Sequence, residues 1–301
     1  MPLKEPLLPL TPLFASPYDL ADRLPPLIAD FLDLEITLRR RFREESVSDM
    51  IVASLLRLAG ADLSVQVPSS EKVTGNDFDI IVYEPPTRNA VQYRIQAKRL
   101  TPHATNWGMG SYKELAHPHG TGTQSSALIR SSAAEKRILT IPLYAFYNPA
   151  RTCTASGGSV NGLKLADGYA IRAQIAKLLK AKPKRPPVKR LATLHSLFFP
   201  LSTLLCPPSP VSERRILKPE ESLRAVEGAI KAATRRQGGG ETTPIIAAPD
   251  NVDAAFPKRI RSTRLGPTLP QVLALATARR QSSDSFVHAD VRCPTIVLFA
   301  D

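Results

Sequence analysis

Alternation of apolar and polar positions between residues 63 and 100 predicts three consecutive β-strands. The first is short and ends at Pro68, the second is the run DFDIIVYE (77–84), and the third is AVQYRIQAKRL (90–100). Only the TRN sequence and two prolines separate the second strand from the third. Because so short a connection joins antiparallel strands, the pattern predicts a hairpin.

Apolar residues at helical spacing predict helices on both sides of this block. Residues 18–34 have this spacing but contain Pro25 and Pro26. Residues 35–58 predict a stronger helix, or two helices if Ser46 or Ser48 caps a break within it. Further helices are predicted over 123–136, 168–181, 219–236 and 269–280. Apolar strands are predicted over 138–148 and 295–301, and the last should pair into a sheet.

The order of these elements predicts an α/β fold with a mixed central sheet flanked by helices. We divide the chain into an N-terminal arm and helix (1–34), a core (35–150) and a basic, Pro-rich, helical C-terminal region (151–301). The last region either completes the fold or forms a smaller nucleic-acid-binding part.

Charge is distributed unevenly along the chain. Residues 1–150 hold 16 basic and 16 acidic side chains, so the whole net charge of +13 lies in residues 151–301. A basic region attracts polyanions by counterion release, which favours a nucleic-acid partner. One basic run could clamp a phosphate backbone or form a solvated linker. Its residues are Lys180, Lys182, Lys184, Arg185, Lys189 and Arg190.

Several features indicate a cytoplasmic protein without a membrane partner. No apolar run approaches the ~18 residues that span a bilayer. The apolar N-terminus is broken by prolines, unlike a signal peptide. The three cysteines are widely spaced, which suits a reducing compartment.

Polar residues on the predicted hairpin carry the candidate chemistry. Asp77 and Asp79 share one face of a strand, and Gln96 and Lys98 share a face of the next. In a hairpin, a carboxylate, an amide and an ammonium group would converge at one end of the sheet. Oxygen ligands suit Mg²⁺, which lowers the pKa of bound water, and a lysine can assist that water or stabilise developing charge.

These residues resemble the signature of the PD-(D/E)xK, or restriction-endonuclease-like, nuclease superfamily. Gly75-Asn76-Asp77 matches the Gly-x-Asp half, and Gln96-Ala97-Lys98 matches the (D/E/Q)xK half. The longer pattern ESVSDM, GNDFDI, QAKRL and IPLYAFYNP also resembles an uncharacterised bacterial family with this core. The resemblance covers about residues 40–150.

The resemblance implies roles for individual residues. Asp77 would be the main ligand of Mg²⁺ (or Mn²⁺), Gln96 would ligate or position with help from the Ala97 carbonyl, and Lys98 would serve the attacking water. The superfamily often adds a glutamate from an upstream helix, for which Glu45 is our first choice and Glu44 the second. Further candidates are Asp79 as the alternative to Asp77, Gln124 from the following helix, and Arg99 as a nucleic-acid contact.

The resemblance implies a metal-dependent nuclease that hydrolyses phosphodiester bonds, with DNA favoured over RNA and a role in bacterial defence. A homodimer is a further expectation, since nucleases that cut both strands often dimerise. Gln96 stands where many members carry Glu or Asp, which leaves open a catalytically inactive nucleic-acid-binding module. A third alternative is a protein that binds a partner protein through its C-terminal helices.

Overall fold

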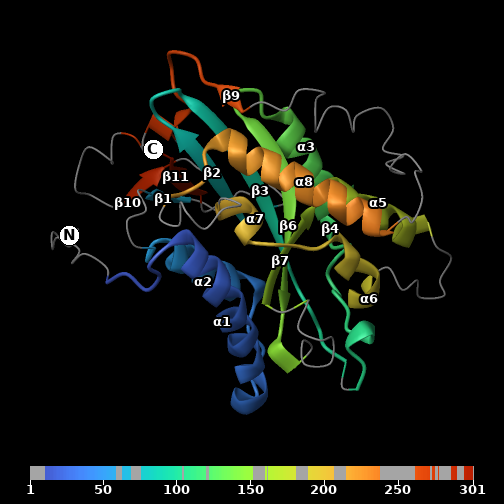
Figure 1. Cartoon of the computed structure of the whole chain (residues 1–301). Helices are drawn as coiled ribbons and strands as arrows, with labels where there is room; N and C mark the ends of the chain where they lie inside the picture. Colours follow the sequence, from blue (N-terminus) through green and yellow to red (C-terminus); the bar gives the residue numbers. More distant parts are fainter. Residues whose placement is uncertain are drawn as a thin grey trace.

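The computed structural model describes most of the chain between residues 11 and 300. The described residues are 11–58, 63–68, 76–103, 105–119, 122–151, 160, 162–180, 189–206, 215–237, 262–271, 273, 274, 277, 286–289 and 295–300. Within them, the fold is an α/β structure with one mixed central sheet flanked by helices, as predicted (Figure 1).

The central sheet has the strand order β10-β1-β11-β2-β3-β6-β7-β8 in the described part of the chain, and β9 pairs with β3. Its strands are β1 (Leu63–Pro68), β2 (Phe78–Glu84), β3 (Asn89–Arg99), β6 (Leu139–Asn148), β7 (Gly162–Asp167), β8 (Phe199–Pro200), β9 (Thr263–Arg264), β10 (Phe286–Ala289) and β11 (Thr295–Phe299). Two short strands, β4 (Pro118–His119) and β5 (Gly122–Thr123), pair separately.

The predicted hairpin is confirmed, since β2 and β3 pair antiparallel with Ile80 opposite Tyr93. On its other side β3 runs parallel to β6, which places Gln96 opposite Tyr144. The final strand also enters the sheet as predicted, because β11 lies between β1 and β2. The hairpin is therefore central in the sheet.

The first two helices differ from the prediction in where they break. Helix α1 (Pro17–Leu38) continues through Pro25 and Pro26, and α2 (Glu44–Leu55) begins six residues after it. The break lies at residues 39–43 and not at Ser46 or Ser48, so that part of the prediction was wrong. Arg39 ends α1 in the left-handed region, with φ of 51°, which turns the chain away from the helix.

The later predicted helices are confirmed as α3 (Gln124–Ala134), α5 (Gly168–Lys180) and α8 (Pro219–Gln237). Short helices are α6 (Leu191–Leu194), α7 (Ser202–Leu205) and the 3-10 turns η1 (Trp107–Met109) and η3 (His195–Leu197). Residues 271, 273, 274 and 277 are helical, within the predicted 269–280 helix, whose other residues lie partly outside the described ones.

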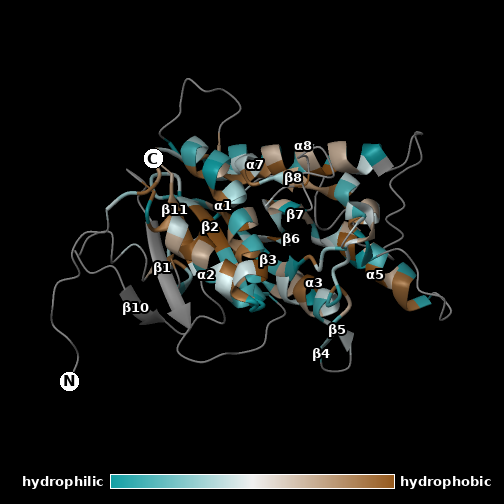
Figure 2. Ribbon diagram, turned by 90° about the horizontal axis from the view of Figure 1, so that it is seen from below, coloured by the Kyte–Doolittle hydropathy of each residue, from teal (hydrophilic) through white to brown (hydrophobic). Residues whose placement is uncertain are grey.

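Helices cover both faces of the sheet (Figure 2). The side chains of Val82, Tyr93 and Leu143 belong to the core beneath α1, α2, α7 and α8. Tyr144 and Phe146 belong to a second core with α3, α5 and α6. Buried apolar area on both faces stabilises the sheet and holds β2 and β3 in one position.

The sheet does not end at residue 150. Strand β7 pairs antiparallel with β6, and β8, β10 and β11 also follow residue 150 in the chain. The described strands of residues 151–301 therefore belong to the central sheet. The N-terminal helix α1 packs on β7 as well, so it too belongs to this core.

A close backbone approach fixes α1 on β7. Gly162 has φ of +62°, and a Cβ atom at this position would lie 1.8 Å from the carbonyl oxygen of Pro25. Only glycine fits such a contact and such a conformation without strain. Among the described helices, none is long and apolar enough to cross a membrane.

Candidate active site on the β2–β3 hairpin

Asp77 and Gln96 meet at the start of β2, as the sequence predicts. The Oδ2 atom of Asp77 accepts hydrogen bonds from the Ala97 backbone N–H at 2.5 Å and from Gln96 Nε2 at 2.6 Å. The Asp77 N–H donates to the Ile95 carbonyl at 2.8 Å, which extends the hairpin pairing by one residue. The adjacent strand thus fixes the position of the carboxylate.

Lys98 is held by Glu44, at the start of α2. Its Nζ atom lies 3.2 Å from Glu44 Oε2, and the Arg99 backbone N–H donates to Glu44 Oε1 at 3.0 Å. The Lys98 side chain is 2% exposed and that of Glu44 is 20% exposed. Glu45 is exposed on the same turn. The structure therefore brings Glu44, our second choice, to Lys98 and leaves our first choice, Glu45, at the surface.

Burial raises the pKa of Asp77 to about 6, which is the largest effect on this group. The Ala97 N–H and the charge of Lys98 act in the opposite direction, whereas the nearby charges of Glu44 and Glu45 raise the pKa further. The ionised carboxylate is therefore poorly compensated by the protein alone, and a cation beside it would stabilise the charged form.

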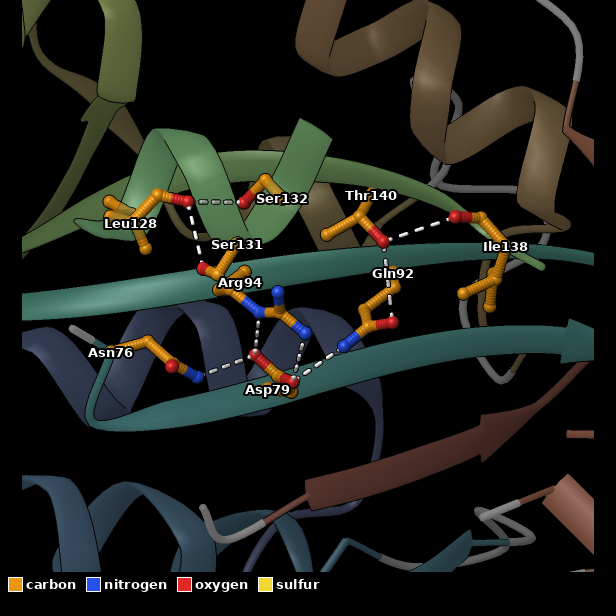
Figure 3. A network of polar contacts seen from close by, with 9 residues as sticks. All are labelled: Asn76, Asp79, Gln92, Arg94, Leu128, Ser131, Ser132, Ile138 and Thr140. Atoms are coloured by element: carbon orange, nitrogen blue, oxygen red, sulfur yellow. Dashed lines mark hydrogen bonds and ion pairs between the residues drawn. The ribbon is translucent and has the colours of Figure 1, made fainter. Parts of the chain in front are cut away.

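Asp79 is committed to a separate network of polar contacts (Figure 3). It accepts hydrogen bonds from Asn76 Nδ2 at 2.8 Å and from Gln92 Nε2 at 2.5 Å, and Arg94 forms an ion pair with it at 3.4 Å. Asp79 is 4% exposed. These partners occupy both of its oxygens, so of the two aspartates Asp77 is the better candidate for chemistry.

Among the buried side-chain oxygens without a hydrogen-bond partner in the described structure, two belong to candidate site residues. They are Oε1 of Gln96, a residue that is 1% exposed, and Oε1 of Gln124. Gln124 is the first residue of α3, and no hydrogen bond joins it to Asp77, Gln96 or Lys98 within the described residues. A buried acceptor without a donor is costly, and it is the kind of group that a metal ion or an ordered water satisfies.

The residues present fit Mg²⁺ or Mn²⁺ better than zinc. The described residues contain no group of three or more His, Cys, Asp or Glu side chains that could hold a metal. Mg²⁺ needs only one or two carboxylates, and it takes its other ligands from amide oxygens and waters. Asp77 and the free amide oxygen of Gln96 offer such a set of oxygen ligands. The Glu44 carboxylate binds the ammonium group of Lys98, which lies two residues after Gln96 on β3.

Of the predicted nucleic-acid contacts in the basic run, the structure describes Lys180, Lys189 and Arg190. Lys182, Lys184 and Arg185 lie outside the described residues. Lys189 donates to the Lys113 carbonyl at 3.0 Å, and Arg190 pairs by a backbone bridge with Ser111, so both pack on the loop after β3. Lys189 and Arg190 therefore contact the protein and do not lie in the solvated linker that was one of the two interpretations of the basic run.

A pocket that the sequence analysis missed adjoins Arg99. Its volume is about 310 Å³. It is lined by Glu35, Ile36, Arg39, Arg40, Arg41, Arg99, Thr101, Pro102 and Arg151. The sequence RRRFR at residues 39–43 is a signal that could have indicated it, but a net charge taken over residues 1–150 hides this local cluster.

Fold and site together define an α/β protein with a carboxylate, an amide and a lysine on adjacent central strands. A family of unknown function, DUF6615, matches residues 18–289, and the chain belongs to this family. No curated protein and no solved structure matches the chain significantly.

Proposed function

We propose that the protein is a cytoplasmic, metal-dependent nuclease of the PD-(D/E)xK type, acting on DNA in preference to RNA. The proposal depends above all on one observation. A buried carboxylate with a raised pKa, Asp77, lies beside a free buried amide oxygen of Gln96 and one strand away from the buried Lys98. Perturbed titratable groups gathered in this way are typical of functional sites.

Asp77 and Gln96 would hold the metal ion, which when bound would polarise the phosphate and lower the pKa of a water. The Ala97 N–H fixes the orientation of the Asp77 carboxylate through Oδ2, leaving Oδ1 free of the hairpin contacts. Glu44 holds the Lys98 ammonium group where solvent is almost excluded. In such an environment a cation stabilises negative charge on a phosphate more strongly than it would in water.

A specific observation favours a second candidate, a nucleic-acid-binding module without catalysis. Asp77 already accepts two hydrogen bonds, and Lys98 is already paired with Glu44. The same contacts can serve stability alone, and Gln96 in place of an acidic residue lowers the negative charge available to a metal. A role in bacterial defence suits either candidate.

Cleavage assays with plasmid DNA and RNA in Mg²⁺ and Mn²⁺ separate the candidates. The wild type should cleave. Lys98→Ala should cleave at least about 100-fold more slowly, since one charge-stabilising donor contributes about that much to the rate. Lys177→Ala, which changes an exposed lysine on α5, is the matched control and should cleave like the wild type. If the wild type binds DNA but is as inert as Lys98→Ala with both metals, the protein is the binding module.

A further inference from the structure

The pocket beside Arg99, which we call the arginine pocket, gathers five arginines against one acidic residue, Glu35. Arg39, Arg40 and Arg41 come from the segment after α1, Arg99 from the end of β3, and Arg151 from the segment after β6. Segments far apart in the sequence thus bring their cations to one place. Such convergence of like charge is unfavourable unless an anion is present.

The loop that carries Arg39, Arg40 and Arg41 is held firmly at its base. The ring of Phe42 stacks on Phe31, with centroids 4.2 Å apart, and the Phe42 N–H donates to Glu35 Oε1 at 2.6 Å. Arg99 donates to the Phe42 carbonyl at 3.1 Å. The backbone of the loop is therefore positioned in advance, which lowers the entropic cost of ligand binding.

The cations of the pocket differ in how far they are neutralised. In the described part of the chain, Arg99 forms an ion pair with Glu35, and Arg151 forms one with Asp33 at 2.7 Å. The other three arginines, Arg39, Arg40 and Arg41, are exposed and have no acidic partner among the described residues. Arg99 and Arg151 are therefore already paired with carboxylates, whereas the guanidinium groups of Arg39, Arg40 and Arg41 remain available to an anion.

The like charges of neighbouring arginines also affect the pKa of Arg99. Its pKa is lowered first by burial and then by the like charges of Arg41 and Arg151, while Glu35 and Glu44 act in the opposite direction. An anion in the pocket would offset the repulsion from Arg41 and Arg151. The direction of this pKa change agrees with the gathering of arginines around the pocket.

The arginine pocket and the candidate active site meet at the end of β3 and at Glu44. Arg99 follows Lys98 in β3, and the carboxylate of Glu44 binds both the Lys98 ammonium group and the Arg99 backbone N–H. The side chains of Lys98 and Arg99 leave opposite faces of the strand, so the sites are linked through Glu44 and the shared strand end, and a nucleic-acid strand must pass around this end to reach both.

We propose that the arginine pocket binds a phosphate group of the nucleic-acid strand whose scissile phosphodiester lies at Asp77 and Lys98. Guanidinium groups match phosphate oxygens in bidentate geometry, and a phosphate has enough oxygens for several of them at once. A single carboxylate is satisfied by one guanidinium fork, so the number of arginines favours phosphate over an acidic peptide. A volume of about 310 Å³ holds a phosphate with its sugar.

The test is fluorescence polarisation of a labelled single-stranded oligonucleotide in EDTA, where the proposed cleavage is prevented. The double variant Arg40→Glu/Arg41→Glu should weaken binding at least about 10-fold. The slope of log binding constant against log salt concentration should fall by the amount expected for about two lost phosphate contacts. Arg40→Lys/Arg41→Lys keeps the charge but not the fork and should show an intermediate loss. Arg224→Glu/Arg235→Glu on α8 makes the same charge change at exposed positions and should alter binding less than about 3-fold.

Equal weakening by the pocket variant and the α8 control would overturn the inference, because the effect would then come from net charge alone. Unchanged binding in the pocket variant would overturn it as well. Inorganic pyrophosphate should compete with the oligonucleotide in the wild type and not in the pocket variant. If pyrophosphate binds the pocket and the oligonucleotide does not, the pocket takes small phosphates and the assignment to a strand is wrong.

The inference rests on the proposed function for its substrate, and the two can fail separately. If cleavage requires Lys98 but neither cleavage nor binding changes in Arg40→Glu/Arg41→Glu, the pocket inference is lost and the nuclease remains. If the wild type does not cleave but oligonucleotide binding depends on Arg40 and Arg41, the phosphate-binding role of the pocket stands, and the nuclease and the placement of a scissile phosphodiester are lost. Circular dichroism of each variant confirms that the substitutions leave the fold intact.

Discussion

Replacing Asp77 by Asn is expected to stabilise the folded protein at neutral and alkaline pH. The pKa of Asp77 is raised from an ordinary 3.8 to about 6, chiefly by burial. The folded state therefore holds this proton more tightly than the unfolded state does. The contribution to stability is fully present below pH 3.8 and is lost as the pH rises through 6.

The size of the effect follows from the shift. At about 1.4 kcal/mol for each pKa unit, the ionised carboxylate destabilises the fold by about 3 kcal/mol above pH 7. Asn is neutral and its Oδ1 can still accept the Ala97 N–H, although the charge-assisted contact with Gln96 is weakened. We therefore expect Asp77→Asn to gain about 1–3 kcal/mol near pH 8 and less than about 1 kcal/mol near pH 4.

Urea unfolding in EDTA at several pH values measures this difference. The sequence contains one tryptophan, Trp107, whose fluorescence can be compared with far-UV circular dichroism to test cooperativity. Asp49→Asn, which changes an exposed aspartate on α2, is the control and should show little dependence on pH. A difference between Asp77→Asn and wild type that does not vary with pH, or a less stable variant at pH 8, would refute the reasoning.

Three further predictions follow from the same contacts. Glu44→Ala leaves the Lys98 ammonium group buried without its partner and should destabilise the fold by about 2–4 kcal/mol in urea unfolding, whereas Glu45→Ala should change it by less than about 0.5 kcal/mol. Gly162→Ala places a Cβ atom against the Pro25 carbonyl at positive φ, so we expect a loss of about 3 kcal/mol or more, and a variant as stable as the wild type would contradict this packing. Mg²⁺ should raise the thermal midpoint of the wild type above pH 6 and leave that of Asp77→Asn unchanged, and an equal shift in both would place the ion elsewhere.

The sheet and its main helices could be predicted because their patterns are long and regular. Strand β3 alternates apolar and polar residues, and β2 and β6 contain runs of apolar residues. Helix α8 has acidic residues at its start and basic residues at its end. Strand β7 was missed because GLKLAD is short and carries Lys164 in its middle. Its place is set by pairing with β6, which is a tertiary effect that local sequence does not contain.

The continuity of α1 through its two prolines was not predicted, again because it depends on tertiary packing. Pro25 and Pro26 weaken a helix by removing backbone donors, and the sequence gives no sign of the compensation. In the structure Leu24 and Ile28 on either side of them are fully buried. Their burial, with the close contact between Pro25 and Gly162, keeps α1 continuous. Packing thus decided against local propensity.

The site was predicted as far as strand periodicity reaches. Alternation placed Gln96 and Lys98 on one face of a strand, but the choice between Asp77 and Asp79 depended on which of them found other partners. The choice between Glu44 and Glu45 depends on a turn of about 100° between neighbouring residues of a helix, which sequence boundaries do not resolve. The run RRRFR could have indicated three arginines of the arginine pocket, but Arg99 and Arg151 join them from distant segments, which no local pattern predicts.

The central claim is that Asp77 holds a metal ion that cleaves phosphodiesters, and one measurement addresses it most directly. The measurement is the single-turnover cleavage rate of labelled DNA and RNA by wild type and Asp77→Asn, each in Mg²⁺ and in EDTA. We expect the wild type to cleave in Mg²⁺, and removing either the carboxylate or the metal to slow cleavage by at least about 100-fold. Cleavage at the same rate in EDTA or by Asp77→Asn, or no cleavage of either nucleic acid by the wild type, would contradict it.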